Sequence, residues 1–216
     1  MRRFPSIIFA SLALGSAAQA QVFQSCTKSE QVIVGKALAD SKRLALTAAA
    51  NVGENAIYET WFGKFTPQNS ELVRSNLKSI VSAIRTGSVT AVCDSVGPDG
   101  CEAGTFAWVY PDEPFEVHFC PQFFEMPSMT DYRPGAAKDE NGTREGTVVH
   151  EISHFQRAAS TDDNCYARDV CADMAVRSPQ DAVENADSYQ YFAEDVGYFY
   201  AADPKADINA SSQEAN

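Results

Sequence analysis

The chain has 216 residues, of which 44% are hydrophobic and 21% are charged, a balance typical of a globular protein and not of a disordered one. It has 17 Lys and Arg and 29 Asp and Glu, and the net charge of −12 argues against the basic surface that binding to a nucleic-acid backbone requires. No apolar run reaches the roughly 18–20 residues of a membrane span, so we expect a soluble monomer with neither a nucleic-acid nor a membrane partner.

Residues 1–20 have the three-part pattern of a secretory signal peptide. Arg2 and Arg3 precede an apolar stretch at positions 7–14, and the small-residue sequence Ala18-Gln19-Ala20 follows it. We therefore expect cleavage after Ala20, a mature chain that begins at position 21, and an extracellular location.

Two helices are predicted in the first part of the mature chain. Apolar residues recur at helical spacing between positions 29 and 51, and again between positions 70 and 85. Ser70 stands at the start of the second pattern and is a typical N-cap residue.

A small antiparallel sheet is predicted next. The runs 89–93, 105–110 and 115–119 are rich in β-branched and aromatic residues, and turns at 97–100 and 111–114 separate them. Antiparallel pairing is the arrangement that short connections between consecutive strands favour.

Helical patterns return at 145–158, 164–177 and 180–200. The predicted fold class is therefore α+β, with helices and a small sheet first, then a helix that carries the motif described below, and two further helices. We expect residues 21–203 to form one domain with two lobes around a cleft, and residues 204–216 to be a frayed polar tail.

All cysteines lie beyond the predicted cleavage point. Their even number in an exported chain predicts three disulfides, although six cysteines allow 15 pairings. No Cys-x-x-Cys sequence occurs, which argues against a metal–thiolate site. The six are Cys26, Cys93, Cys101, Cys120, Cys165 and Cys171.

The sequence His-Glu-Ile-Ser-His at positions 150–154 predicts a zinc site. On a helix, residues four apart face the same way, so the imidazoles of His150 and His154 can bind one cation. Glu151 can then reach a water on that cation without binding it. His118, the remaining histidine, lies upstream in a predicted strand, where we expect a structural role.

A catalytic zinc needs a third protein ligand and an open position for water. Asp163 lies nine residues after the second histidine, beyond a small-residue break that can reverse the chain, and Asp162 is its immediate rival. Glu184, Glu194 and Asp187, all further along the chain, are the other candidates. Two neutral imidazoles and one carboxylate would leave the site at net +1, which lowers the pKa of bound water.

Several segments resemble the aspzincin metalloendopeptidases, which comprise deuterolysin and the fungal peptidyl-Lys metalloendopeptidases. Residues 146–155 (Gly-Thr-Val-Val-His-Glu-Ile-Ser-His-Phe) and 161–166 (Thr-Asp-Asp-Asn-Cys-Tyr) carry the resemblance. Residues 58–63 (Tyr-Glu-Thr-Trp-Phe-Gly) and 185–194 (Asn-Ala-Asp-Ser-Tyr-Gln-Tyr-Phe-Ala-Glu) add to it, and the last segment is most similar to the Lys-specific branch. The resemblance spans nearly the whole mature chain and implies a zincin-like fold.

The resemblance also implies a set of roles. It places one zinc ion on His150, His154 and Asp163, with Glu151 as the general base. Tyr166 matches the family tyrosine that hydrogen-bonds the oxyanion. The chain is thus expected to be a secreted zinc endopeptidase acting on proteins and peptides; the alternative is a catalytically lapsed, zinc-stabilised binding or effector protein of the same fold.

Substrate preference follows from the same resemblance. Asp187 matches an acid that lines the pocket for a basic side chain just after the cleaved bond, which implies cleavage on the N-terminal side of Lys. Gln190 stands where the Lys-specific enzymes have a second carboxylate, so the substrate-binding pair carries one charge fewer here. The family motif has Gly at two further positions where this chain has Ser160 and Ala167.

The resemblance implies two disulfides, Cys26–Cys93 and Cys101–Cys120. The remaining cysteines, Cys165 and Cys171, are then left to form a third bridge, which we do not expect in every relative.

Overall fold

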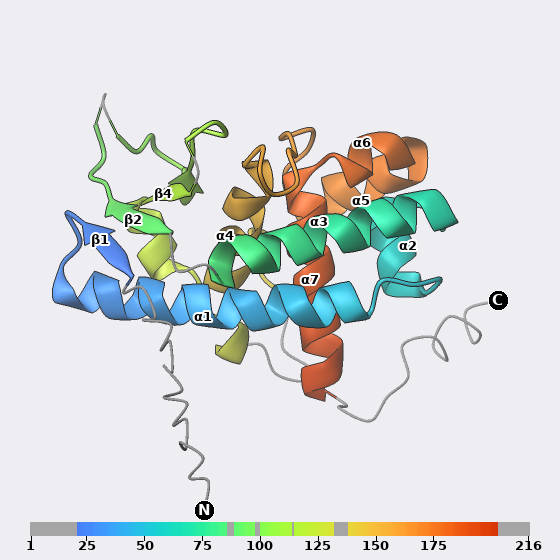
Figure 1. The fold of residues 1–216 in the computed structure, drawn as a ribbon, viewed down its shortest axis with the longest axis horizontal. Coiled ribbons are helices and arrows are strands. Elements are labelled where there is room, and N and C mark those ends of the chain that lie inside the picture. Colours follow the sequence, from blue (N-terminus) through green and yellow to red (C-terminus); the bar gives the residue numbers. More distant parts are fainter. Residues whose placement is uncertain (1–20, 86–88, 98–99, 114, 132–137, 203–216) are drawn as a thin grey trace, which may run out of the picture.

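The computed structural model describes residues 21–85, 89–97, 100–113, 115–131 and 138–202 (Figure 1). The predicted signal peptide and the predicted tail, 204–216, lie outside this part of the chain. Within it, no helix combines the length and the apolar character needed to cross a membrane.

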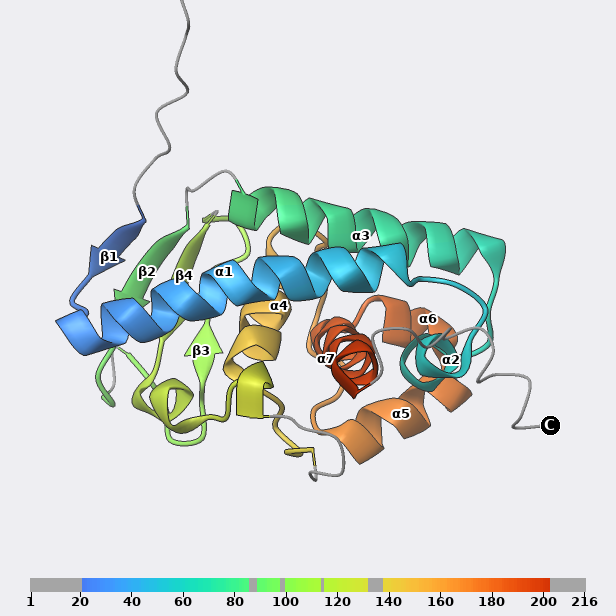
Figure 2. The ribbon, with the colours of Figure 1, turned by 90° about the horizontal axis from the view of Figure 1, so that it is seen from below.

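Two long helices, α1 (Lys28–Ala50) and α3 (Pro67–Arg85), lie side by side along the molecule (Figure 2). The helix α1 matches its prediction closely. The helix α3 begins three residues earlier than predicted, because the hydroxyl of Thr66 accepts the backbone N–H of Asn69 at 3.1 Å and caps it there. Ser70, the predicted N-cap, therefore lies inside the helix.

The sheet is mixed, and the prediction of an antiparallel sheet is wrong. Its strand order is β1-β2-β4-β3; β1, β2 and β4 are parallel, and only β3 runs antiparallel to β4. The turns do separate the strands, but β4 lies between β2 and β3, so these two strands, which follow one another in the chain, are not neighbours in the sheet. The strands are β1 (Val22–Gln24), β2 (Thr90–Cys93), β3 (Ala107–Trp108) and β4 (Glu116–Phe119).

Three disulfides are present: the two that the resemblance implied, and a third between the two cysteines that remained. Cys26–Cys93 joins the start of α1 to the end of β2, and Cys101–Cys120 ties the connection before β3 to the end of β4. Cys165–Cys171 closes a short segment in the second half of the chain.

In the described part of the chain, three helices follow the motif helix α4 (Arg144–His154), where two were predicted. The expected helix 180–200 is divided into α6 (Pro179–Val183) and α7 (Ala186–Ala202). The break falls at Asn185. Its side-chain oxygen accepts two backbone N–H groups of the loop that follows α4. The remaining helices are α2 (Ala56–Phe62), α5 (Arg168–Arg177) and the 3-10 turns η1 (Pro121–Glu125) and η2 (Met129–Asp131).

The helix α7 runs across α1 through the middle of the helical layer (Figures 1 and 2). Aromatic side chains hold it there: Phe62 of α2 packs edge-on against Tyr189 and Phe192 of α7, with ring centroids 5.1 and 5.3 Å apart. The helix α4 packs against α1, α3 and α7. The first turns of α7 consequently lie against the motif helix.

Candidate metal centre and substrate cleft

The helix α4 carries the His-Glu-x-x-His sequence through the interior of the protein. Thr143 caps it, because its hydroxyl accepts the backbone N–H of Gly146 at 3.0 Å. From its second residue to its last, the helix is buried. The two histidines are therefore held by packing on every side except the one that opens into a cleft.

The structure brings His150, His154 and Asp163 together around one point. The two imidazole Nε2 atoms lie 3.1 Å apart, and Asp163 Oδ1 lies 3.3 Å from His150 Nε2 and 3.4 Å from His154 Nε2. Zinc takes such donors at about 2.0–2.2 Å in tetrahedral geometry, which separates neighbouring donors by about 3.3–3.6 Å. Both distances to Asp163 lie in this range, and the distance between the two imidazole nitrogens is about 0.2 Å shorter, so a small adjustment of the rings would seat an ion of this size and leave one tetrahedral position for a fourth ligand.

Each imidazole is oriented through its other nitrogen. His150 Nδ1 donates to Asp187 Oδ1 at 2.7 Å, and His154 Nδ1 donates to the backbone carbonyl of Thr161 at 2.8 Å. Protonation at Nδ1 leaves the Nε2 lone pairs free to face the metal position. Asp187, one of the candidate ligands, therefore lies behind a histidine and not beside the ion.

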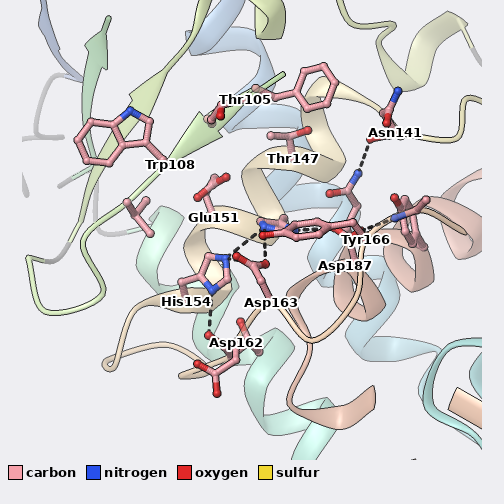
Figure 3. A pocket seen from close by; sticks show the side chains of 18 of the residues that line it. Thr105, Trp108, Asn141, Thr147, Glu151, His154, Asp162, Asp163, Tyr166 and Asp187 are labelled. Atoms are coloured by element: carbon pink, nitrogen blue, oxygen red, sulfur yellow. Dashed lines mark hydrogen bonds and ion pairs between the residues drawn. The ribbon is translucent and has the colours of Figure 1, made fainter. Parts of the chain in front are cut away.

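The other candidate acids lie elsewhere. Asp162 is exposed and points away from Asp163, and its backbone forms a bridge with the α6–α7 junction (Figure 3). Glu184 is exposed at the end of α6. Glu194 is completely buried against Thr143, at the beginning of α4. Of the acids considered from the sequence, only Asp163 shares the metal position with both histidines.

Two further groups face this position (Figure 3). Burial raises the pKa of Glu151 above its ordinary value, and the neighbouring imidazoles of His150 and His154 oppose that shift. A raised pKa brings a carboxylate closer to the proton affinity that a general base requires. The hydroxyl of Tyr166 is hydrogen-bonded to Asp163; burial and this bond raise the pKa of the tyrosine, so it remains a proton donor.

The metal position lies in a cleft of about 600 Å³. Residues 105–109 around the edge strand β3 form one wall, and α4 with the first turns of α7 forms the other. Asp187 and Gln190 both line it, and the Gln190 Nε2 donates to the backbone carbonyl of Asn141 at 3.1 Å. Trp108 in the β3 wall stacks on His118 at 3.7 Å, so this histidine supports the cleft wall, away from the metal position.

Trp108, Asn141 and Thr147 line the cleft but were not singled out from the sequence. Trp108 reaches the cleft because β3 is an edge strand, and the order of the strands cannot be read from local patterns. Thr147 lies one helical turn before His150, a spacing that could have identified it.

A comparison with known families decides the relationship. Residues 47–194 match the aspzincin family model, which is described as lysine-specific metallo-endopeptidase. The chain belongs to the aspzincin family. All residues placed around the metal position lie within the matched segment.

The aspzincin relatives include proteins from bacteria and fungi. The chain is 33% identical over 165 residues to an extracellular protease of Aeromonas hydrophila, covering 70% of this chain but 43% of that protein. It is 31% identical to a peptidyl-Lys metalloendopeptidase of Pleurotus ostreatus, covering 80% of this chain and 95% of that protein. A solved structure, a zinc peptidase from Grifola frondosa, matches with a TM-score of 0.67 and 28% identity over 79% of this chain and 97% of the other.

Both positions at which the chain departs from the aspzincin glycines have left-handed backbone. Ser160 has φ 53° and Ala167 has φ 69°. A side chain in this region costs about 1–2 kcal/mol, a cost that glycine avoids. The loop keeps the backbone conformation that suits glycine, although the residues have changed.

Replacing Ser160 by Gly is therefore expected to stabilise the protein by about 1 kcal/mol. Relief of the left-handed strain outweighs the greater freedom that glycine gives the unfolded chain. Urea unfolding measures the change. Ser160→Ala is the matched control, because it removes the hydroxyl but keeps the strained Cβ; a similar gain from alanine would contradict the explanation.

Proposed function

We propose that this chain is a secreted zinc endopeptidase whose catalytic domain comprises residues 21–203. The observation that carries the proposal is the triangle of His150, His154 and Asp163 donor atoms with Glu151 beside it in an open cleft. The extracellular relative and the three disulfides support export. Because all four residues are in place, the alternative of a lapsed site is not favoured.

The residues of the site have distinct tasks. Zinc, when bound, supplies a Lewis acid that polarises the scissile carbonyl and makes a water more acidic. Glu151 accepts the proton of the attacking water and passes it to the leaving amine. Tyr166 donates its hydroxyl proton in a hydrogen bond to the carbonyl oxygen as negative charge develops there. Asp187 holds the His150 ring so that its Nε2 faces the ion.

We further propose cleavage on the N-terminal side of Lys. Relatives from three fungi carry the name peptidyl-Lys metalloendopeptidase. In this chain Asp187 and Gln190 lie on one wall of the cleft and offer oxygen acceptors to an ammonium group. Because the carboxylate of Asp187 is also bound to His150 and Gln190 is neutral, the preference for Lys is expected to be weaker than two free carboxylates would give.

Digestion of a peptide library, read by mass spectrometry, tests catalysis and preference together. We expect internal cleavage before Lys, lost with a zinc chelator and restored by added zinc. Absence of cleavage by the zinc-loaded protein would refute the proposed activity, and cleavage without any basic preference would refute the proposed specificity alone.

The neighbouring acids Asp162 and Asp163 provide a sharp test of the ligand set. Asp163→Asn is expected to weaken zinc binding by at least about 100-fold, because a neutral amide replaces a charged ligand. Asp162→Asn is the matched control, and its zinc affinity should stay within about threefold of the parent. Competition with a chromogenic chelator measures both. Equal losses would remove the assignment of the third ligand.

Gln190→Glu is expected to strengthen the Lys preference and lower stability at once. A carboxylate there would add about tenfold to kcat/KM for Lys over norleucine substrates, the size of one charge-assisted hydrogen bond. In the free enzyme it would face the Asn141 carbonyl and Glu194, which lie 3.1 and 3.4 Å from the present amide nitrogen. Kinetics and thermal unfolding are the measurements; an unchanged ratio would place the basic pocket elsewhere.

A further inference from the structure

The segment between the third metal donor and α5 is closed by a disulfide. Cys165–Cys171 spans six residues and encloses Tyr166 and Ala167, and Asp163 lies just before it. Both cysteines are buried, with 7% and 0% of their surface exposed. The bridge therefore constrains the part of the chain that carries the tyrosine of the site.

Ala167 has a backbone conformation that alanine rarely adopts. Its φ of 69° and ψ of 150° lie in a region occupied almost only by glycine. In this conformation its N–H donates to Asp187 Oδ2 at 3.2 Å. The other oxygen of Asp187 accepts from His150 Nδ1 at 2.7 Å. A chain of two hydrogen bonds thus leads from the strained residue to a metal-facing imidazole.

One side chain, that of Asn185, lies against both ends of the segment. Asn185 Oδ1 accepts the backbone N–H groups of Asn164 at 2.8 Å and Cys165 at 3.0 Å. The amide nitrogen of Asn185 lies 3.8 Å from Cys171 Sγ. The loop entry is therefore fixed by hydrogen bonds, while its exit into α5 is tied back by the disulfide.

We infer that the Cys165–Cys171 disulfide is a positioning element of the active site: it keeps Ala167 in its glycine-like conformation, and thereby keeps Asp187 on His150 and Tyr166 over the metal position. Glycine at position 167 would adopt this backbone conformation without a constraint. In this chain position 167 is alanine, and the disulfide keeps it in that conformation. The inference rests on the proposed function, since it concerns the same site.

A purely global role is the competing explanation. A disulfide stabilises mainly by restricting the unfolded chain, and more so for longer loops. Cys26–Cys93 closes 67 residues and Cys165–Cys171 only six. Loss of the first should therefore lower the melting temperature more, whereas loss of the second should affect the site more.

The experiment compares C165A/C171A with the control C26A/C93A and with the triple variant C165A/C171A/A167G, all zinc-loaded and full length. We expect kcat to fall about tenfold in C165A/C171A with KM within about threefold, and zinc affinity to fall about 10-fold, as for loss of a supporting contact to a ligand. In the triple variant, glycine at position 167 should restore most of the lost kcat and most of the lost zinc affinity. The control should lose more thermal stability and keep its kcat.

Several outcomes would overturn the inference. Unchanged kcat and zinc affinity in C165A/C171A would do so, as would the same kcat loss in C26A/C93A or no recovery in the triple variant. If C165A/C171A does not fold, hydrogen exchange of the parent decides: the Ala167 amide must exchange slowly with the bridge intact, and fast exchange refutes the inference. An inactive parent that binds zinc would instead refute the proposed function, while the zinc-affinity and exchange results would still judge the disulfide.

Discussion

Replacing Glu151 by Gln is expected to lower kcat/KM for peptide hydrolysis by about 10³-fold while zinc remains bound. The amide has the same shape as the carboxylate but cannot accept the proton of the attacking water, and general acid–base catalysis contributes about 10²–10⁴-fold. The proposed ligand set of His150, His154 and Asp163 is left intact. Hydrolysis of a quenched fluorescent peptide and metal analysis of the same sample measure the two effects.

The matched control is Glu184→Gln, which makes the same chemical change at an exposed acid outside the cleft. Its kcat/KM should remain within about twofold of the parent. Retained activity in the Glu151 variant would remove the assigned base. A loss of zinc from it would show that Glu151 holds the ion, which the proposed roles do not allow.

The motif helix could be predicted because the sequence pattern that specifies it lies within a few consecutive residues. The four-residue spacing of His150 and His154 fixes both rings on one face of a helix, and α4 places their Nε2 atoms 3.1 Å apart. The third donor was not settled by spacing. Its position depends on the path of the loop after α4, which the Thr161 carbonyl and the bridge between Asp162 and Asn185 determine.

The pairing of the strands in the sheet could not be predicted from local sequence patterns. Turn residues correctly separated the runs that became β2, β3 and β4, but they carry no information on which strands pair. The parallel register of Ala91 with Val117 turns both side chains into the core. That choice depends on burial against the helices and not on the connecting turns. The same limit hid Trp108, which reaches the cleft only because β3 is at the edge.

The place of Asp187 in the cleft could be predicted from the sequence, but its contact with His150 could not. The resemblance pointed to a pocket acid, and Asp187 does line the cleft. Its contact with His150 joins two elements 37 residues apart, and no spacing rule predicts such a contact. Ser160 and Ala167 are the opposite case, because a substitution visible in the motif identified the positions that have left-handed backbone.

The second large effect is expected from Glu194, which anchors the beginning of the motif helix. One of its oxygens accepts the backbone N–H of Thr143 at 2.7 Å and its hydroxyl at 2.8 Å, and the other pairs with Arg168. Glu194→Ala would leave these buried donors without that acceptor, at a cost of about 3–5 kcal/mol in unfolding free energy. Urea unfolding at neutral pH measures it. The control Glu71→Ala, at a side chain 81% exposed, should change stability by less than about 0.5 kcal/mol.

Glu194→Gln separates the charge of this group from its shape. Burial raises the pKa of Glu194 to about 7, while Arg168 and Thr143 oppose the shift; in the unfolded chain the value is about 4.3. The folded state therefore holds this proton more tightly, so the stability that the protonated group contributes is complete below about pH 4 and is lost as the pH rises to about 7. Glutamine does not titrate. The unfolding free energy of Glu194→Gln minus that of the parent should consequently rise between pH 4.5 and 7.5 in metal-free protein. All other titratable groups are present in both proteins, so their contributions cancel in this difference. A difference that falls over this range would show that Arg168 and Thr143 outweigh burial and that the carboxylate is the form the fold prefers.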